Sequence, residues 1–164
     1  MVPLSDRAAA VDPEVVPETE LHGAGTGKVQ TVLLATDLTP ASDAATRQAI
    51  DMAASLRARL LVVNVIDQGG PVSPLATVRV DQQRAIREGP LLQIVDRARS
   101  RGVDAAFLLW TGEPGQGIVA AAEAEGADMV IVGTRGLDRA GRFLLGSVSD
   151  YVVYHSVCPV MVAR

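Results

Sequence analysis

Residues 128–163 read DMVIVGTRGLDRAGRFLLGSVSDYVVYHSVCPVMVA, and their pattern indicates how the chain folds. It begins with one short apolar run, Asp128–Val132, and ends with another, Pro159–Ala163. The segment between them is rich in glycine and then places apolar residues at helical spacing over about Ser147–Ser156. A strand, a helix and a second strand in this order predict a right-handed crossover between parallel strands.

Three earlier apolar runs have the same character: Thr31–Thr36, Leu60–Ile66 and Ala105–Trp110. Most of them are nearly continuous in Val, Leu and Ile, which is typical of strands that are covered on both faces in a parallel sheet. Helical segments separate the runs, so the whole pattern predicts one doubly wound α/β domain. We expect a five-stranded parallel sheet in the order 3-2-1-4-5, numbered along the chain, with helices on both faces.

Four helices are predicted, over about 39–57, 90–102, 114–126 and 147–156. Thr39, followed by a proline, is expected to be the N-cap of the first. In the second, Gly89-Pro90 is expected to break or kink the chain, so the main body is placed after the proline and 72–88 is left unassigned. Ser147 and Asp150 have the spacing of a capping box, with Asp in place of the more usual Glu.

The composition excludes several classes of protein. Of the 164 residues, 48% are hydrophobic, which is enough for the core of one domain. Lys and Arg number 15 against 19 Asp and Glu and form no basic run, so nucleic-acid binding is not expected. The apolar runs are far shorter than the roughly 20 residues of a membrane span, so no membrane partner is expected either. Cys158 is the only cysteine, which excludes an internal disulfide and a cysteine-based zinc site.

The first 28 residues show neither strand nor helix periodicity and contain scattered prolines. We expect a flexible extension over 1–28, followed by a domain over 29–164. The N-terminus lacks the apolar stretch of a secretory signal, and a cytoplasmic location is predicted. Gly23–Lys28 is only superficially like a phosphate-binding P-loop, because His22 holds the first glycine position and Val29 the Ser/Thr position.

The strand order alone predicts where a ligand binds. In the order 3-2-1-4-5 the chain leaves the first and fourth strands in opposite directions, and ligands of such sheets bind in the crevice at the carboxyl ends of those strands. Two loops are expected to line this crevice: Thr36-Asp37-Leu38 and Gly133-Thr134-Arg135-Gly136.

The spacing Gly133-x2-Gly136-x9-Gly146-Ser147 suits a phosphate. Gly133 and Gly136 are expected to take positive φ and to let a ligand approach the backbone closely. Gly146-Ser147 opens a helix whose first N–H groups and dipole favour an anion, with the hydroxyls of Ser147 and Ser149 as further donors. Positive charge in the same segment comes from Arg135, Arg139 and Arg142.

This glycine spacing resembles the ATP-binding signature of the universal stress protein family. The resemblance extends to Ala35-Thr36-Asp37, to Asn64-Val65-Ile66-Asp67 and to the terminal Cys158-Pro-Val-Met-Val, and it covers about residues 30–164. It implies an ATP-binding protein with a regulatory role in the stress response. In this resemblance Asp37 contacts the nucleoside and the Val65 backbone meets the adenine. The nucleotide-binding residues that it implies are Ala35, Thr36, Asp37, Val65, Gly133, Arg135, Gly136, Gly146, Ser147, Val148 and Ser149.

Several of these residues also have a purely structural interpretation. Asp37 can cap the turn before the first helix, and Gly133 and Gly136 can be turn glycines. Asp150 is assigned to helix capping because it would repel a phosphate. The sequence offers no evident general base and no Ser/His/Asp arrangement, so no catalytic residue is assigned. The resemblance implies slow ATP hydrolysis at most, with Mg²⁺ entering through the phosphates and no protein metal site.

Two other functions stay open at this point. One is a sensor for cyclic AMP or another adenine nucleotide in the same fold, and the other is a dimeric interaction module without a nucleotide. The last strand, Pro159–Ala163, is an edge of the predicted sheet, rich in Val and Met and without charge before Arg164. We therefore expect a homodimer in which two copies of this edge pair antiparallel.

Overall fold

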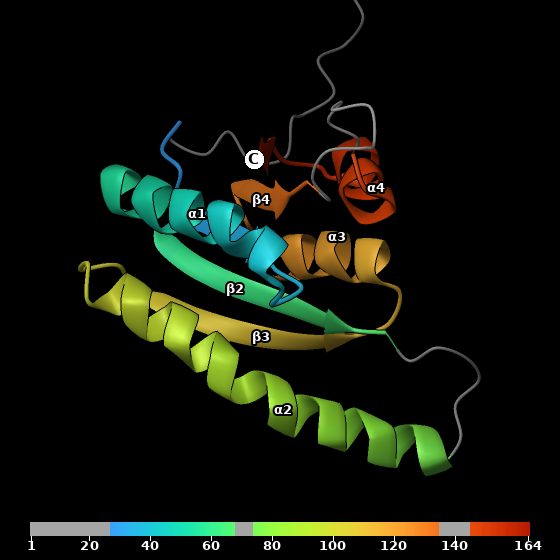
Figure 1. Cartoon of the computed structure of the whole chain (residues 1–164). Helices are drawn as coiled ribbons and strands as arrows, with labels where there is room; N and C mark the ends of the chain where they lie inside the picture. The colour runs from blue at the N-terminus through green and yellow to red at the C-terminus, as the bar shows by residue number, and fades with distance from the viewer. Residues whose placement is uncertain (1–26, 68–73, 135–144) are drawn as a thin grey trace, which may run out of the picture.

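The computed structural model describes residues 27–67, 74–134 and 145–164 (Figure 1). The predicted extension over 1–28 falls almost entirely outside these ranges, and so do Arg135 and Gly136 of the predicted site. The strands are β1 (Thr31–Ala35), β2 (Arg59–Ile66), β3 (Ala105–Thr111), β4 (Met129–Gly133) and β5 (Val160–Ala163). Neighbouring strands run parallel in the order β3-β2-β1-β4-β5, which confirms the predicted topology.

Helices cover both faces of this sheet. They are a short 3-10 helix, η1 (Pro40–Ser42), and the α-helices α1 (Asp43–Leu56), α2 (Pro74–Arg99), α3 (Pro114–Ala124) and α4 (Ser147–His155). The helices α1 and α2 pack on one face, and α3 and α4 pack on the other (Figure 1). Because the winding reverses between β1 and β4, the carboxyl ends of these two strands are left for a ligand.

Two hydrophobic cores hold the layers together. Val32 and Leu34 of β1 face α1 and α2, whereas Leu33 faces α3 and α4, and all three are fully buried. Successive side chains of a strand point to opposite faces, so a continuous apolar run serves both cores. Burial of each such side chain contributes about 1.5–3 kcal/mol to folding.

The helix α3 approaches its neighbours unusually closely. A Cβ atom built on Gly115 would lie 2.8 Å from Cδ1 of Tyr151 in α4, and one built on Gly117 would lie 2.9 Å from Cγ1 of Val65 in β2. The carboxylate of Glu113 caps this helix by accepting from the N–H groups of Gly115 and Gln116. The two glycines therefore let α3 sit directly against the carboxyl end of β2.

The predicted break at Gly89-Pro90 is wrong, because α2 continues through Pro90 from residue 74 to residue 99. A proline inside a helix removes one backbone hydrogen bond and clashes with the preceding turn. Pro90 and the preceding turn at Ile86 are exposed, so water can satisfy the carbonyl group that lost its donor. Leu91 and Val95 anchor the helix in the core immediately after the proline. Within the described part of the chain, no helix has both the length and the apolar character needed to cross a bilayer.

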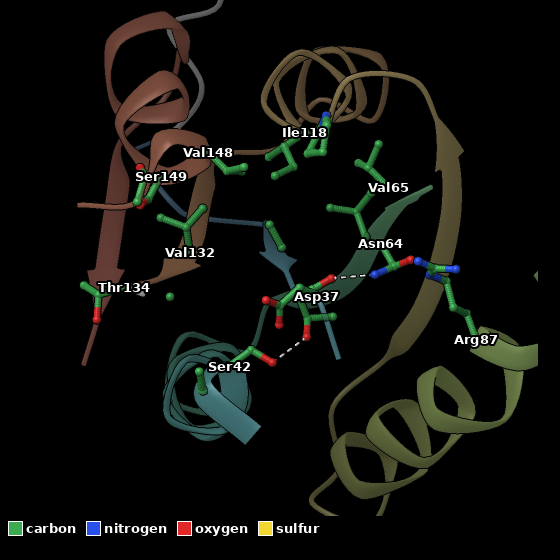
Figure 2. Close-up of a pocket in the computed structure, with 17 residues that line it drawn as sticks. Asp37, Ser42, Asn64, Val65, Arg87, Ile118, Val132, Thr134, Val148 and Ser149 are labelled. Atoms are coloured by element: carbon green, nitrogen blue, oxygen red, sulfur yellow. Dashed lines mark hydrogen bonds between the residues drawn. The ribbon is translucent and has the colours of Figure 1, made fainter. Parts of the chain in front are cut away.

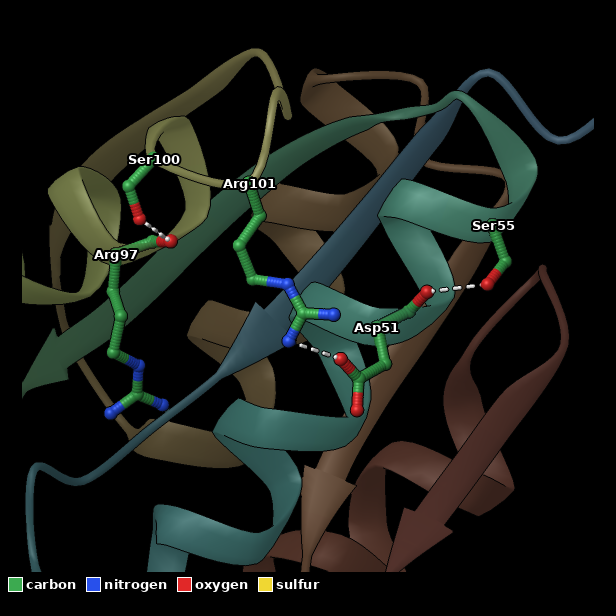
Figure 3. Close-up of polar contacts among 5 residues, drawn as sticks. All are labelled: Asp51, Ser55, Arg97, Ser100 and Arg101. Carbon is green, nitrogen blue, oxygen red and sulfur yellow. Dashed lines mark hydrogen bonds and ion pairs between the residues drawn. The ribbon is translucent and has the colours of Figure 1, made fainter.

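Polar contacts tie together the loops at the amino ends of the strands. Oδ2 of Asp128, before β4, accepts hydrogen bonds from the backbone N–H groups of Gln30 (2.8 Å) and Thr31 (2.9 Å). Figure 3 shows Arg101, which follows α2, reaching Asp51 of α1 with 2.7 Å between Nη1 and Oδ1. Both members of this ion pair are more than half exposed, so it contributes little to stability.

Candidate functional site

A pocket of about 330 Å³ lies at the carboxyl ends of β1, β2 and β4 (Figure 2). Its location agrees with the crevice expected from the strand order. The 3-10 helix η1, the N-terminal turns of α3 and α4, and one residue of α2 complete its walls. The lining residues are Ala35, Thr36, Asp37, Ala41, Ser42, Val63, Asn64, Val65, Arg87, Pro114, Ile118, Val132, Gly133, Thr134, Gly146, Val148 and Ser149.

Most of the predicted site residues come together in this pocket. Eight of them line it: Ala35, Thr36, Asp37, Val65, Gly133, Gly146, Val148 and Ser149. Ser147 is different, because it is exposed at the first position of α4 and is absent from the lining. Arg135 and Gly136 lie outside the described residues. The residues directly before β2, β3 and β4 are at the opposite end of the sheet and do not line this pocket.

Asp37 caps the turn after β1 and also lines the pocket. Its Oδ1 accepts from the backbone N–H of Thr39 at 3.0 Å and from the Thr39 hydroxyl at 2.8 Å. Leu38, between them, has a φ of 63°, a left-handed conformation that is uncommon for leucine. Thr39 is the N-cap of η1 and a proline follows it, as predicted, although the Thr39 side chain makes no capping bond. The α-helix itself begins later, at Asp43, with Ser42 as its N-cap.

The first turn of α4 differs from the predicted capping box. Gly146, and not Ser147, is the N-cap, and no side chain caps the helix. The predicted Ser147–Asp150 box is therefore wrong, because the helix begins one residue earlier than the box requires. The N–H groups of the first turn have no acceptor within the helix itself, and helix N-termini of this kind favour negatively charged groups. Ser149, 4% exposed, donates its hydroxyl proton to the Gly146 carbonyl at 3.0 Å.

The two described glycines of the signature do not need their special backbone freedom. Gly133 is not among the glycines with positive φ, contrary to the prediction, and Gly146 has φ −68° and ψ 158°. A Cβ atom on Gly133 would meet Ala45 at 3.6 Å, which is ordinary van der Waals contact. Neither backbone conformation excludes a side chain, so the turn-glycine interpretation is not supported for Gly133. The described backbone and its contacts therefore leave room for a side chain at Gly133.

Several lining residues were not predicted, and two of them form polar links across the pocket floor. Oγ1 of Thr36 and Oγ of Ser42 lie 2.9 Å apart in a buried hydrogen bond. Nδ2 of Asn64 donates to the Thr36 carbonyl at 2.8 Å, while its Oδ1 is buried and has no partner among the described residues. Asn64 could have been found from the sequence, because it is a polar residue inside an otherwise apolar strand. Arg87 and Ser42 gave no comparable signal.

The pocket combines apolar and polar surfaces. Figure 2 shows Val65, Ile118, Val132 and Val148 around one side, where they suit a flat apolar ring. The start of α4 offers donors for an anion. Among the described lining residues, the charged ones are Asp37 and Arg87. In the described ranges no cluster of three or more His, Cys, Asp or Glu residues is placed to hold a metal ion.

Comparison with known proteins gives a consistent result. The model of the universal stress protein family matches residues 28–164. A universal stress protein of Synechocystis is 38% identical over 84 residues, which cover 51% of this chain and 54% of that protein, so the chain spans about half the length of this relative. A universal stress protein of Methanocaldococcus jannaschii is 29% identical over 141 residues, which cover 81% of each chain.

A solved structure agrees with these sequence matches. The crystal structure of a universal stress protein in complex with cAMP is 28% identical, has a TM-score of 0.63, and covers 84% of this chain and 98% of that chain. The family model accounts for the sheet, the helices and the pocket-forming segments together. The chain belongs to the universal stress protein family.

Proposed function

We propose that this chain is an ATP-binding universal stress protein with a regulatory role in the stress response. The observation that carries the proposal is the convergence of eight expected nucleotide-binding residues in one pocket at the switch point of the sheet. The pocket has the volume range of a small-molecule site. Its lining residues suit the two parts of a nucleotide, the base and the phosphate chain.

The two parts of ATP have different places in this proposal. The base lies near the Val65 backbone among aliphatic side chains, and Asp37 contacts the nucleoside with the part of its carboxylate that does not cap the turn. The phosphates lie against Gly133 and the N–H groups of Gly146, Val148 and Ser149 at the start of α4. Arg135, Gly136 and Ser147 are further proposed phosphate and ribose contacts.

A sensor of cyclic AMP is the second candidate. A solved universal stress protein in complex with cAMP favours this candidate, because its alignment covers 84% of this chain. Both ligands use the same adenosine portion and differ in phosphate geometry. An interaction module without nucleotide is a third candidate, and the absence of side chains at Gly133 and Gly146 argues against it.

Mass spectrometry of nucleotide released from the purified full-length chain tests the proposal. We expect the released nucleotide to be ATP. In titration calorimetry, ATP should then bind more tightly than cyclic AMP. Release of cyclic AMP and preference for it would favour the sensor. Failure of the chain to bind ATP, cyclic AMP and adenosine would contradict nucleotide binding altogether.

Chemistry on the nucleotide is not required for this role. Mg²⁺ would bind through the phosphates, whose oxygens suit a hard cation that keeps several waters. Any ATP hydrolysis would be slow, because the proposal assigns no general base. A phosphate-release assay with and without Mg²⁺ measures this rate.

We also propose a homodimer through the edge strand β5. The carbonyl groups of Pro159 and Ala163 accept from β4, so the backbone groups of Val160 and Val162 point away from the sheet. Proline at Val162 would remove an outward N–H group and should convert dimer to monomer. Light scattering checks this, with Val162→Thr as the control that keeps the N–H group. A monomeric unmodified chain at micromolar concentration would contradict the dimer.

A further inference from the structure

Asn64 carries a buried group that the described part of the chain does not satisfy. The residue is 3% exposed, and its Oδ1 has no hydrogen-bond partner there. The amide orientation is fixed, because turning it over would replace the 2.8 Å bond from Nδ2 to the Thr36 carbonyl by two opposed oxygen atoms. The unsatisfied group is therefore an acceptor, and it needs a donor.

Arg87 of α2 is the cation that lines the same pocket as this acceptor, among the described residues. Both residues line the same pocket, and Figure 2 shows the Arg87 side chain reaching from α2 toward the amide oxygen of Asn64. Nη1 of Arg87 donates to Oε1 of Gln83, one turn earlier in the helix. The guanidinium carries further N–H donors on Nε and Nη2 in the same plane. Oδ1 of Asn64 accepts no hydrogen bond in the described structure, so a bond from one of these further N–H groups of Arg87 is part of the proposal below.

The same end of the pocket has no aromatic side chain among its described lining residues. Val65 and Ile118 offer aliphatic contact to one face of a flat ring. A guanidinium group is planar and weakly hydrated, so it can stack on the other face of such a ring. An acceptor that holds the guanidinium plane in place favours such stacking, because less side-chain freedom is then lost on binding.

We propose that Arg87 is a ligand-binding residue that stacks its guanidinium on the base of the bound nucleotide, and that Oδ1 of Asn64 positions this guanidinium. The inference rests on the proposed function, because it requires a base in the pocket. Arg87 contacts the ligand. Asn64 acts through Arg87 and is a positioning residue.

Substitution of Arg87 separates a contact with the base from a contact with the phosphates. Arg87→Ala should raise the dissociation constants of adenosine and of ATP by the same factor, about fivefold to tenfold. Arg87→Lys keeps the positive charge but lacks the planar guanidinium group, so it should restore less than half of the affinity lost in Arg87→Ala. Arg84→Ala, at an exposed position of the same helix outside the pocket lining, should change neither constant. Titration calorimetry measures both dissociation constants for the unmodified chain and the three variants.

A double-mutant cycle on adenosine affinity tests the role of Asn64. Asn64→Ala should weaken adenosine binding in the unmodified background and cause no further loss in the Arg87→Ala background. A purely structural role would cost the same in both backgrounds, and that result would overturn the positioning role. Circular dichroism confirms folding, and the Arg87 variants decide the stacking contact even where Asn64→Ala does not fold.

The remaining outcomes are distinct from one another. Unchanged adenosine affinity in Arg87→Ala, with binding intact in the unmodified chain, would overturn this inference and leave the proposed function standing. If Arg87→Ala lost affinity for ATP but not for adenosine, Arg87 would contact the phosphates and not the base, which would also overturn this inference. Failure of the unmodified chain to bind adenosine and ATP would overturn the proposed function and this inference together.

Discussion

At the amino end of the sheet, Asp128 satisfies two backbone N–H groups at the start of β1, and an ion pair links α1 to the turn after α2. At the carboxyl end, by contrast, the first turn of α4 has no side-chain cap, Oδ1 of Asn64 has no partner in the described part of the chain, and Leu38 has a left-handed backbone. The carboxyl end also has internal contacts, such as the Thr36–Ser42 hydrogen bond, but it is the end where a buried described acceptor, Oδ1 of Asn64, has no partner in the described chain. Contacts at the amino end should therefore support stability, and contacts at the carboxyl end should support binding.

The largest expected effect is on binding at the carboxyl end. Gly146→Val should lower ATP affinity by more than about a hundredfold, because a branched side chain would occupy space at the start of α4 where the phosphates are proposed to lie. The chain should stay folded, since φ −68° and ψ 158° suit valine. Calorimetry and thermal unfolding measure both quantities. Gly146→Ala should cause a smaller loss, and unchanged ATP affinity in a folded Gly146→Val protein would place the phosphates elsewhere.

At the amino end, Asp128→Ala should reduce stability and spare binding. Loss of a charged acceptor for two N–H groups should lower the free energy of unfolding by about 2 kcal/mol. Urea denaturation measures this change. Asp128→Asn keeps a neutral acceptor and should cost less than half as much. A drop in ATP affinity in folded Asp128→Ala would break the division between the two ends.

Asp37 both accepts hydrogen bonds in the turn after β1 and lines the pocket, so its replacement tests a structural and a binding role together. Asp37→Ala should weaken ATP and adenosine alike by about tenfold, because it removes a proposed contact with the nucleoside. Thr39→Val, which removes only the hydroxyl that Asp37 accepts from, should leave both affinities unchanged. Titration of both ligands into both variants separates the two roles. Normal adenosine affinity in Asp37→Ala would reduce this residue to a cap of the turn.

The smallest effect is expected for Arg101. Arg101→Ala should lower the free energy of unfolding by less than about 0.5 kcal/mol, because the ion pair with Asp51 is exposed and screened by salt. Urea denaturation at low and high salt measures the difference, which should shrink as salt is added. A loss comparable to that of Asp128→Ala would show that the two contacts have been ranked wrongly.

The sequence predicted the strands and their order well, because continuous apolar runs directly reflect burial on both faces of a parallel sheet. It also located the loops after β1 and β4 at the pocket. Local backbone details were less predictable. Pro90 suggested a helix break because its effect on the backbone is local, whereas Leu91 and Val95 hold the helix through tertiary packing. The spacing of Ser147 and Asp150 could not show that the helix begins after Gly146.

The pocket residues that the sequence missed come from distant segments. Arg87 reaches the pocket from the part of α2 that was left unassigned, and nothing in its neighbourhood distinguishes it from the other arginines of that helix. Ser42 contributes through a bond to Thr36 that depends on how η1 turns back over β1. Such residues become visible only when the topology brings their elements to the same end of the sheet.

The passage of α2 through Pro90 divides this helix into two parts with different expected rates of amide hydrogen exchange. After the proline, Leu91, Val95 and Ala98 are buried, so exchange there should require opening of the core. Before it, residues 81–86 are all exposed, and one backbone bond of the helix is missing at the proline. Backbone amides of this first part should exchange much faster. Arg87 lies at the boundary, so a ligand that engages its side chain should slow exchange over the preceding turns, where the ligand itself makes no contact.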